Sequence, residues 1–162
     1  MRNFFKSFKF AFRGIRYAVL NERNVRVHLV FCAYIMLFSF FYDFSRTQYA
    51  VVFLTLALVL CAELLNTAVE VIVNLHTTHF DQLARVAKDV AAGAVLLCAI
   101  FAVGVGIVLF WDTAVFAEIT AFFKNHRLLL GAFVLSLGAS VYFVVFGKTK
   151  ADVVIKRRRN QK

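Results

Sequence analysis

The chain has 162 residues, of which 62% are hydrophobic, and its mean hydropathy is +0.76. Soluble domains are usually about 45–50% apolar, so the composition excludes an ordinary soluble domain and indicates a membrane protein. The net charge is +10. Because the basic residues flank apolar segments, they are typical of lipid headgroup contacts and topology signals, and no nucleic-acid partner is expected.

The apolar pattern predicts an all-α integral membrane bundle. Residues 1–20 mix Phe and Ile with Lys and Arg at helical spacing, which predicts a basic amphipathic helix in the membrane interface. A plain lead-in to the first span is the simpler alternative. Four spans are then expected at about 27–44, 48–75, 90–111 and 128–146. A polar connector over 76–88 and a loop after residue 111 are expected between them.

The basic residues also predict the topology. Of the 19 Lys and Arg, all but Arg46, Lys124 and Arg127 lie in residues 1–26, in the 76–88 connector or in the tail. Positive charge concentrates on the cytoplasmic side of membrane proteins. We therefore expect both termini and the connector to be cytoplasmic.

The stretch AELLNTAVE (Ala62–Glu70) interrupts the second apolar run with polar side chains. Glu63 and Glu70 differ by only about 20° around a helix, because they are seven residues apart. Asn66, Thr67 and Asn74 fall near the same line, so the five residues form one polar stripe. Acids inside a membrane are usually functional or paired. A hydrogen-bonded pair that specifies helix packing is the structural alternative.

Other polar and charged residues are expected at the same end of the bundle as the stripe. They are Asn21, Glu22, His79, Asp81, Lys88 and Asp89. Carboxylate oxygens suit Mg²⁺, which bridges phosphates, and Lys suits phosphate as a point charge. The set predicts a site for an anion and a metal. Taken singly, a helix-cap role for Glu22 and an ordinary interfacial pair at Lys88 and Asp89 are simpler explanations.

Three blocks together resemble a known family. They are NERN (Asn21–Asn24) with His28, AELLNTAVE, and AKDVAAGAVL (Ala87–Leu96). In this order they closely resemble the prokaryotic diacylglycerol kinase and undecaprenol kinase family over about residues 4–111. The resemblance implies a surface helix, a three-helix core and a homotrimer in the bacterial plasma membrane. It also implies transfer of the γ-phosphate of ATP, with Mg²⁺, to a lipid hydroxyl.

The resemblance further implies roles for individual residues. Glu63 resembles the general base on the lipid hydroxyl, and Glu22 and Glu70 resemble the metal ligands. The implied nucleotide-site residues are Glu22, Asn66, Glu70, His79, Phe80, Asp81, Lys88 and Asp89. Gly14 and Arg16 fall in the surface helix, where the resemblance implies contact with the lipid substrate.

The chain departs from the family pattern in two places. Asn74 stands where the family commonly has Asp, and about 50 residues follow the family core. We therefore expect a lipid-kinase core at 1–111, an additional loop and fourth span at 112–147, and a basic cytoplasmic tail at 148–162.

The blocks favour undecaprenol as the substrate, with diacylglycerol as the alternative. Two non-enzymatic readings stay open. One is a small bundle that conducts ions or protons along the acidic stripe, and the other is a membrane scaffold that uses its basic tail.

Overall fold

The computed structural model describes residues 2–76 and 81–147. Within these two segments the chain forms six helices and no strand, which confirms the predicted all-α class. The helices are α1 (Arg2–Asn21), α2 (Arg23–Ser39), α3 (Arg46–His76), α4 (Gln82–Phe110), α5 (Thr113–Asn125) and α6 (Arg127–Phe146).

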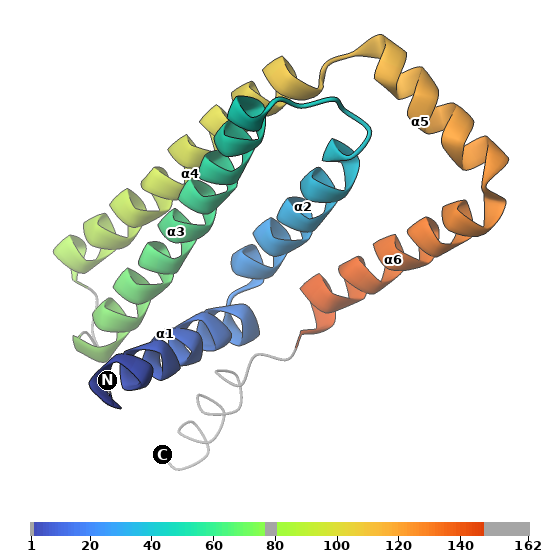
Figure 1. Ribbon diagram of the computed structural model, residues 1–162. Coiled ribbons are helices and arrows are strands. Elements are labelled where there is room, and N and C mark those ends of the chain that lie inside the picture. Colours follow the sequence, from blue (N-terminus) through green and yellow to red (C-terminus); the bar gives the residue numbers. More distant parts are fainter. Residues whose placement is uncertain (1, 77–80, 148–162) are drawn as a thin grey trace.

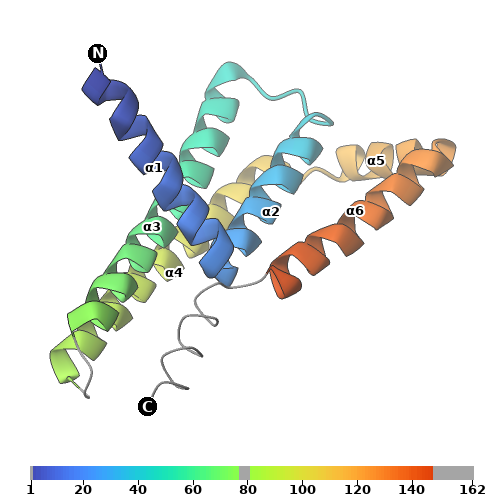
Figure 2. The same ribbon diagram turned by 90° about the horizontal axis from the view of Figure 1, so that it is seen from below.

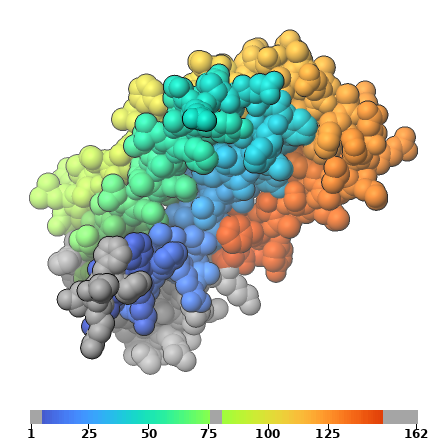
Figure 3. All heavy atoms as spheres, viewed as in Figure 1, coloured from blue at the N-terminus to red at the C-terminus, as the bar shows by residue number. Residues whose placement is uncertain are grey.

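The centre of the fold is a hairpin of α3 and α4, which lie side by side along their length (Figure 1). They contain 31 and 29 residues, or about 45 Å of helix each. α2 packs against α3, and α6 packs against the other side of α2. With all atoms drawn, α2 lies between the hairpin and the C-terminal helices (Figure 3). α1 crosses α2 and α3 at one end of the bundle (Figure 2).

Three of the described helices, α3, α4 and α6, are long and apolar enough to cross a membrane. The expected first span corresponds to α2, which has 17 residues. That is about 25 Å of helix, against a hydrocarbon core of about 30 Å. Most large apolar side chains of α3, α4 and α6 point outward, and α4 buries no residue. Such an outer surface suits lipid better than water.

α4 begins earlier than the apolar pattern predicts. Asp81 precedes the helix, and its Oδ1 accepts hydrogen bonds from the backbone N–H groups of Leu83 (2.8 Å) and Ala84 (3.2 Å). This side-chain cap satisfies donors that a helix start otherwise leaves free. The prediction of a connector up to residue 88 was therefore wrong in its second half. Lys88 and Asp89 lie on α4 itself.

The predicted loop after residue 111 was also wrong, because residues 113–125 form α5. Asp112 caps this helix by accepting hydrogen bonds from Ala114 and Val115. Phe122 then packs on Phe41, with ring centroids 5.2 Å apart. α5 has 13 residues, or about 20 Å of helix, which is too short to cross a bilayer.

Candidate active site

The polar stripe of α3 is buried at its inner end and exposed at its outer end. Glu63 is 2% exposed, Asn66 8% and Thr67 5%. Glu70 is half-buried and Asn74 is exposed. Burial of the first three shows that the inner part of the stripe faces the interior of the bundle. The Thr67 hydroxyl donates to the Glu63 carbonyl at 3.0 Å, which satisfies it within the helix.

The junction between α1 and α2 covers this stripe. Glu22 is the residue between the two helices and stands at the N-cap position of α2, where its side chain makes no capping hydrogen bond. The Asn24 side chain hydrogen-bonds the Glu63 carboxyl, and His28 interacts with it electrostatically. The start of α2 and the middle of α3 therefore meet around one buried carboxyl.

Glu22 faces the other two carboxyls of the site. Burial raises the pKa of the Glu22 carboxyl above its ordinary value, and the charges of Glu70 and then Glu63 raise it further. The Arg26 guanidinium opposes these effects. Like charges at close range disfavour ionisation, so the charges of Glu70 and Glu63 oppose ionisation of the Glu22 carboxyl.

Lys88 joins the site from α4. Its Nζ donates to Asn74 Oδ1 at 2.8 Å, which ties the start of α4 to the end of α3. Asn74 is the position where the resemblance leads one to expect Asp. Because the partner here is a neutral amide, the hydrogen bond holds Lys88 without neutralising its charge. A cationic donor held in this way suits a phosphate group.

Asp89 and Asp81, by contrast, are occupied by local contacts. The Asp89 carboxylate lies 3.7 Å from Arg85 Nε one turn earlier, and both side chains are about 70% exposed. Asp81 caps α4. Neither is brought against the three carboxyls, and His79 and Phe80 lie outside the described residues. Gly14 and Arg16 are exposed on α1, about two turns before the junction.

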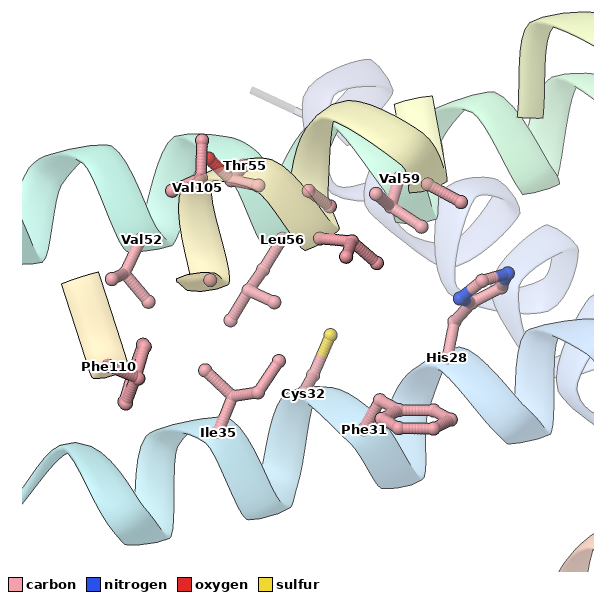
Figure 4. A pocket seen from close by; sticks show the side chains of 14 residues that line it. His28, Phe31, Cys32, Ile35, Val52, Thr55, Leu56, Val59, Val105 and Phe110 are labelled. Atoms are coloured by element: carbon pink, nitrogen blue, oxygen red, sulfur yellow. The ribbon is translucent and has the colours of Figure 1, made fainter. Parts of the chain in front are cut away.

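An apolar cavity of about 510 Å³ lies between α2, α3 and α4. Figure 4 shows His28 at one end and Phe110 at the other, with Ile35 and Leu56 between them. Val59 also lines the cavity and lies one turn before Glu63 on α3. The cavity therefore runs between the three helices from His28, which interacts with the buried Glu63 carboxyl, although Glu63 does not itself line it.

Two side chains of this site, Asn24 and His28, belong to the first block of the family resemblance but were given no role in the predicted site. They are four residues apart on α2, so they share one helix face. Two polar residues on one face at the start of an apolar helix would have been a usable sign. Their contact with Glu63 depends on how α2 packs on α3, which the sequence does not state.

The donor chemistry of the site fits a hard cation only in part. Glu22 and Glu70 offer carboxylate oxygens, the ligands that Mg²⁺ prefers. Asn66 Oδ1 is buried and has no hydrogen-bond partner in the described part of the chain. No group of three or more His, Cys, Asp or Glu residues is placed to hold a metal among the side chains that the structure describes, in residues 6–75 and 81–147.

Fold and site together define a helical membrane protein with a buried acidic site at one end of its longest hairpin. The prokaryotic diacylglycerol kinase family matches residues 9–110. This covers more than half of the chain, and the chain belongs to that family, whose members are lipid kinases.

Individual relatives carry two different names. The chain is 42% identical over 105 residues to a Synechocystis diacylglycerol kinase, covering 64% of the chain and 60% of that protein. It is 36% identical over 110 residues to a Bacillus subtilis undecaprenol kinase, covering 68% of the chain and 89% of the relative. It is 27% identical over 107 residues to an Escherichia coli diacylglycerol kinase, covering 66% and 88%. α5 and α6 follow the matched region.

Proposed function

We propose that the protein transfers the γ-phosphate of ATP to the hydroxyl of undecaprenol. The observation that carries the proposal is Glu63, a carboxyl 2% exposed beside the apolar cavity, in a chain of this family. Glu63 is the group that meets both a lipid chain in the cavity and a reactant arriving from the exposed end of the stripe.

In the proposed reaction, the lipid hydroxyl oxygen attacks the γ-phosphorus of ATP. The new O–P bond forms as the bond from the γ-phosphorus to the bridging oxygen breaks, and ADP leaves. Glu63 accepts the hydroxyl proton, and Asn24 holds the Glu63 carboxyl through its hydrogen bond. Phosphoryl transfer depends mainly on positioning and charge neutralisation, so a small set of residues is sufficient.

Residues at the outer end of the stripe would bind the nucleotide. Mg²⁺ would be held by Glu22 and Glu70, and when bound it supplies neutralisation of phosphate charge. Lys88 adds a second positive charge, held by Asn74. The buried Asn66 amide is free to bond through Oδ1. In this scheme Asp89, Asp81, His79 and Phe80 border the nucleotide rather than hold its phosphates.

Undecaprenol is preferred because one apolar cavity leads away from His28, which interacts with the Glu63 carboxyl. A single polyprenyl chain can enter such a space, whereas diacylglycerol presents two chains to it. Diacylglycerol remains the second candidate, supported by the 42% identity to the Synechocystis diacylglycerol kinase. Gly14 and Arg16 on α1 would lie against the lipid headgroups in either case.

The proposal extends to assembly and orientation. We propose a homotrimer in the bacterial plasma membrane with both termini and the start of α4 in the cytoplasm, where ATP is available. The distribution of basic residues supports this orientation. The large exposed apolar side chains of α3 and α4 offer a surface that both lipid and partner subunits can contact.

The test is a lipid panel with labelled ATP, using purified full-length protein in mixed micelles. We expect phosphorylation of undecaprenol at a higher kcat/KM than dioleoylglycerol, and only with Mg²⁺ present. A higher kcat/KM for dioleoylglycerol would assign the second candidate. If neither lipid is phosphorylated while liposomes containing the protein pass protons without ATP, the protein conducts ions instead.

A further inference from the structure

Arg26 is a buried charge whose hydrogen bonds go to helix ends, while its charge also acts on the nearby Glu22 carboxyl. Arg26 is 3% exposed. Among the described side chains, in residues 6–75 and 81–147, the only ion pair joins Arg85 and Asp89. The Arg26 guanidinium donates instead to backbone carbonyls, through Nη1 to Val19 at 3.0 Å and Leu20 at 3.3 Å, and through Nε to Val144 at 3.4 Å.

These carbonyls belong to the last turns of two different helices. Val19 and Leu20 end α1, and Val144 ends α6. Carbonyls at helix C-termini carry partial negative charge and attract cations. Arg26 also lies in the first turn of α2, where a cation opposes the helix dipole. The two C-terminal ends offset that cost, so one side chain joins three helix ends. Figure 2 shows the end of α6 beside the α1–α2 junction.

The rest of α6 is docked on α2 by specific contacts. Tyr34 Oη lies 2.9 Å from Ser136 Oγ and 3.1 Å from Ser140 Oγ, both in hydrogen-bond range. Its ring also meets Phe133 edge to face, with centroids 5.8 Å apart. These contacts set the rotation of α6 about its axis, and so they decide which carbonyl of its last turn faces Arg26.

The end of α6 approaches Arg26 closely enough to require a glycine. A Cβ on Gly147 would lie 2.9 Å from Arg26 Nε and 2.7 Å from the Phe143 carbonyl. A Cβ on Gly138, in the same helix, would have nothing within 4 Å. The two glycines therefore make a matched pair, since the same substitution disturbs the contact at one and leaves it alone at the other.

The contact bears on the site because Glu22 lies in the junction that Arg26 secures. The Glu22 N–H donates to the Ala18 carbonyl at 2.8 Å, and Ala18 and Val25 are buried on either side. Glu22 thus has its position set by the way α1 meets α2. α6 lies beyond the residues that match the family, 9–110, so this support is an addition to the family core.

We propose that Arg26 is a positioning residue through which α6 holds the α1–α2 junction, and with it Glu22, against Glu63 and Glu70. This inference rests on the proposed function only where it concerns Glu22 and the nucleotide. The mechanical link between α6 and the junction stands on the hydrogen bonds and burial alone.

The test compares Gly147→Ala with Gly138→Ala in the full-length chain. Amide hydrogen exchange over residues 19–26 should be about fivefold faster in Gly147→Ala, the change expected for one lost hydrogen bond. It should be unchanged in Gly138→Ala. The KM for ATP should rise by about the same factor in Gly147→Ala, while the KM for the lipid stays constant.

Each result is decisive. Equal exchange over residues 19–26 in the two variants would overturn the link, whether or not the chain phosphorylates any lipid. Faster exchange with an unchanged KM for ATP would keep the link and remove its effect on Glu22. Absence of kinase activity in the parent chain would sink the proposed function and leave the exchange comparison valid. If Gly147→Ala does not fold, Arg26→Lys replaces it, because it keeps the charge and loses the Nε donor.

Discussion

The two ends of the α3–α4 hairpin are built from different chemistry. One end holds Glu63, Glu70 and Lys88, with the α1–α2 junction packed over them. The other end holds a cluster of aromatic rings in which Tyr42 lies 5.1 Å from Phe44 and 5.0 Å from Phe110. The Tyr42 hydroxyl also donates to the Phe110 carbonyl at 2.8 Å.

The acidic end is therefore expected to serve the reaction, and the aromatic end to stabilise the fold. Rings packed edge to face contribute to stability whether or not a substrate is bound. Buried carboxyls and a Lys without an acidic partner lower stability unless a ligand pairs with them. Changes at the acidic end should therefore alter kinetics more than stability, and changes at the aromatic end should do the reverse.

The largest effect is expected from Glu63→Gln. This substitution keeps the shape and the Asn24 contact but removes the proton acceptor, so kcat should fall by about 10²–10⁴. Steady-state phosphorylation of the preferred lipid measures it, and the thermal midpoint should stay near that of the parent. Glu118→Gln, at an exposed position of α5, is the control. Full turnover by Glu63→Gln would remove this residue as the base.

At the aromatic end, Phe44→Ala should lower stability. Phe44 is half-buried and packs on Tyr42, Tyr49 and Phe110, so about 2 kcal/mol of unfolding free energy should be lost. Unfolding in detergent by a denaturant titration measures this loss. The matched control is Phe40→Ala, because Phe40 is 76% exposed and should lose much less. A change in the KM for ATP larger than the change in stability would show that the ends are coupled.

Helical spacing was sufficient for the main elements of the fold and for the stripe on α3. It could not place the helix ends, because helices α4 and α5 begin at the capping residues Asp81 and Asp112 and not where the apolar pattern begins. α5 was missed for a second reason as well. Its aromatic residues are fixed by Phe41 and Phe133, which come from other helices.

The site, too, could be predicted only in part from the sequence. Spacing showed that Glu63 and Glu70 share a face, but the burial of Glu63 depends on α2 lying over it. Asp89 shows the converse. It is adjacent to Lys88 in the sequence, yet it lies about 100° away on the helix and pairs with Arg85. Adjacency in a motif therefore did not imply a shared role.

A smaller effect is expected from Lys88→Ala. If Lys88 binds a phosphate, its loss should raise the KM for ATP by about tenfold, the size of one charge-assisted hydrogen bond. Lys124→Ala removes the same charge from the last turn of α5 and should leave the KM unchanged. Initial rates at varied ATP and saturating lipid measure both. Equal effects of the two variants would mean that overall charge, not the position of Lys88, governs nucleotide affinity.

The smallest effect concerns Glu22 and pH. Burial raises the pKa of the Glu22 carboxyl from its ordinary value of 4.5, with the charges of Glu70 and Glu63 adding to the shift. A carboxyl with a raised pKa in the fold stabilises it below the ordinary value, and that stabilisation is lost as the pH rises through the folded value. Glu22→Gln should therefore match the parent at pH values below 4.5 and should have the higher thermal midpoint at neutral pH.

The comparison should be made in EDTA first, because a bound cation would favour the charged carboxylate. Equal midpoint differences at both pH values would mean that Glu22 is solvated and does not face the other acids. Glu118→Gln, at an exposed position of α5, is the control for the substitution itself. Addition of Mg²⁺ and ATP should then raise the neutral-pH midpoint of the parent but not that of Glu22→Gln. That reversal would tie the repulsion among the three acids to the ligand that the site is proposed to bind.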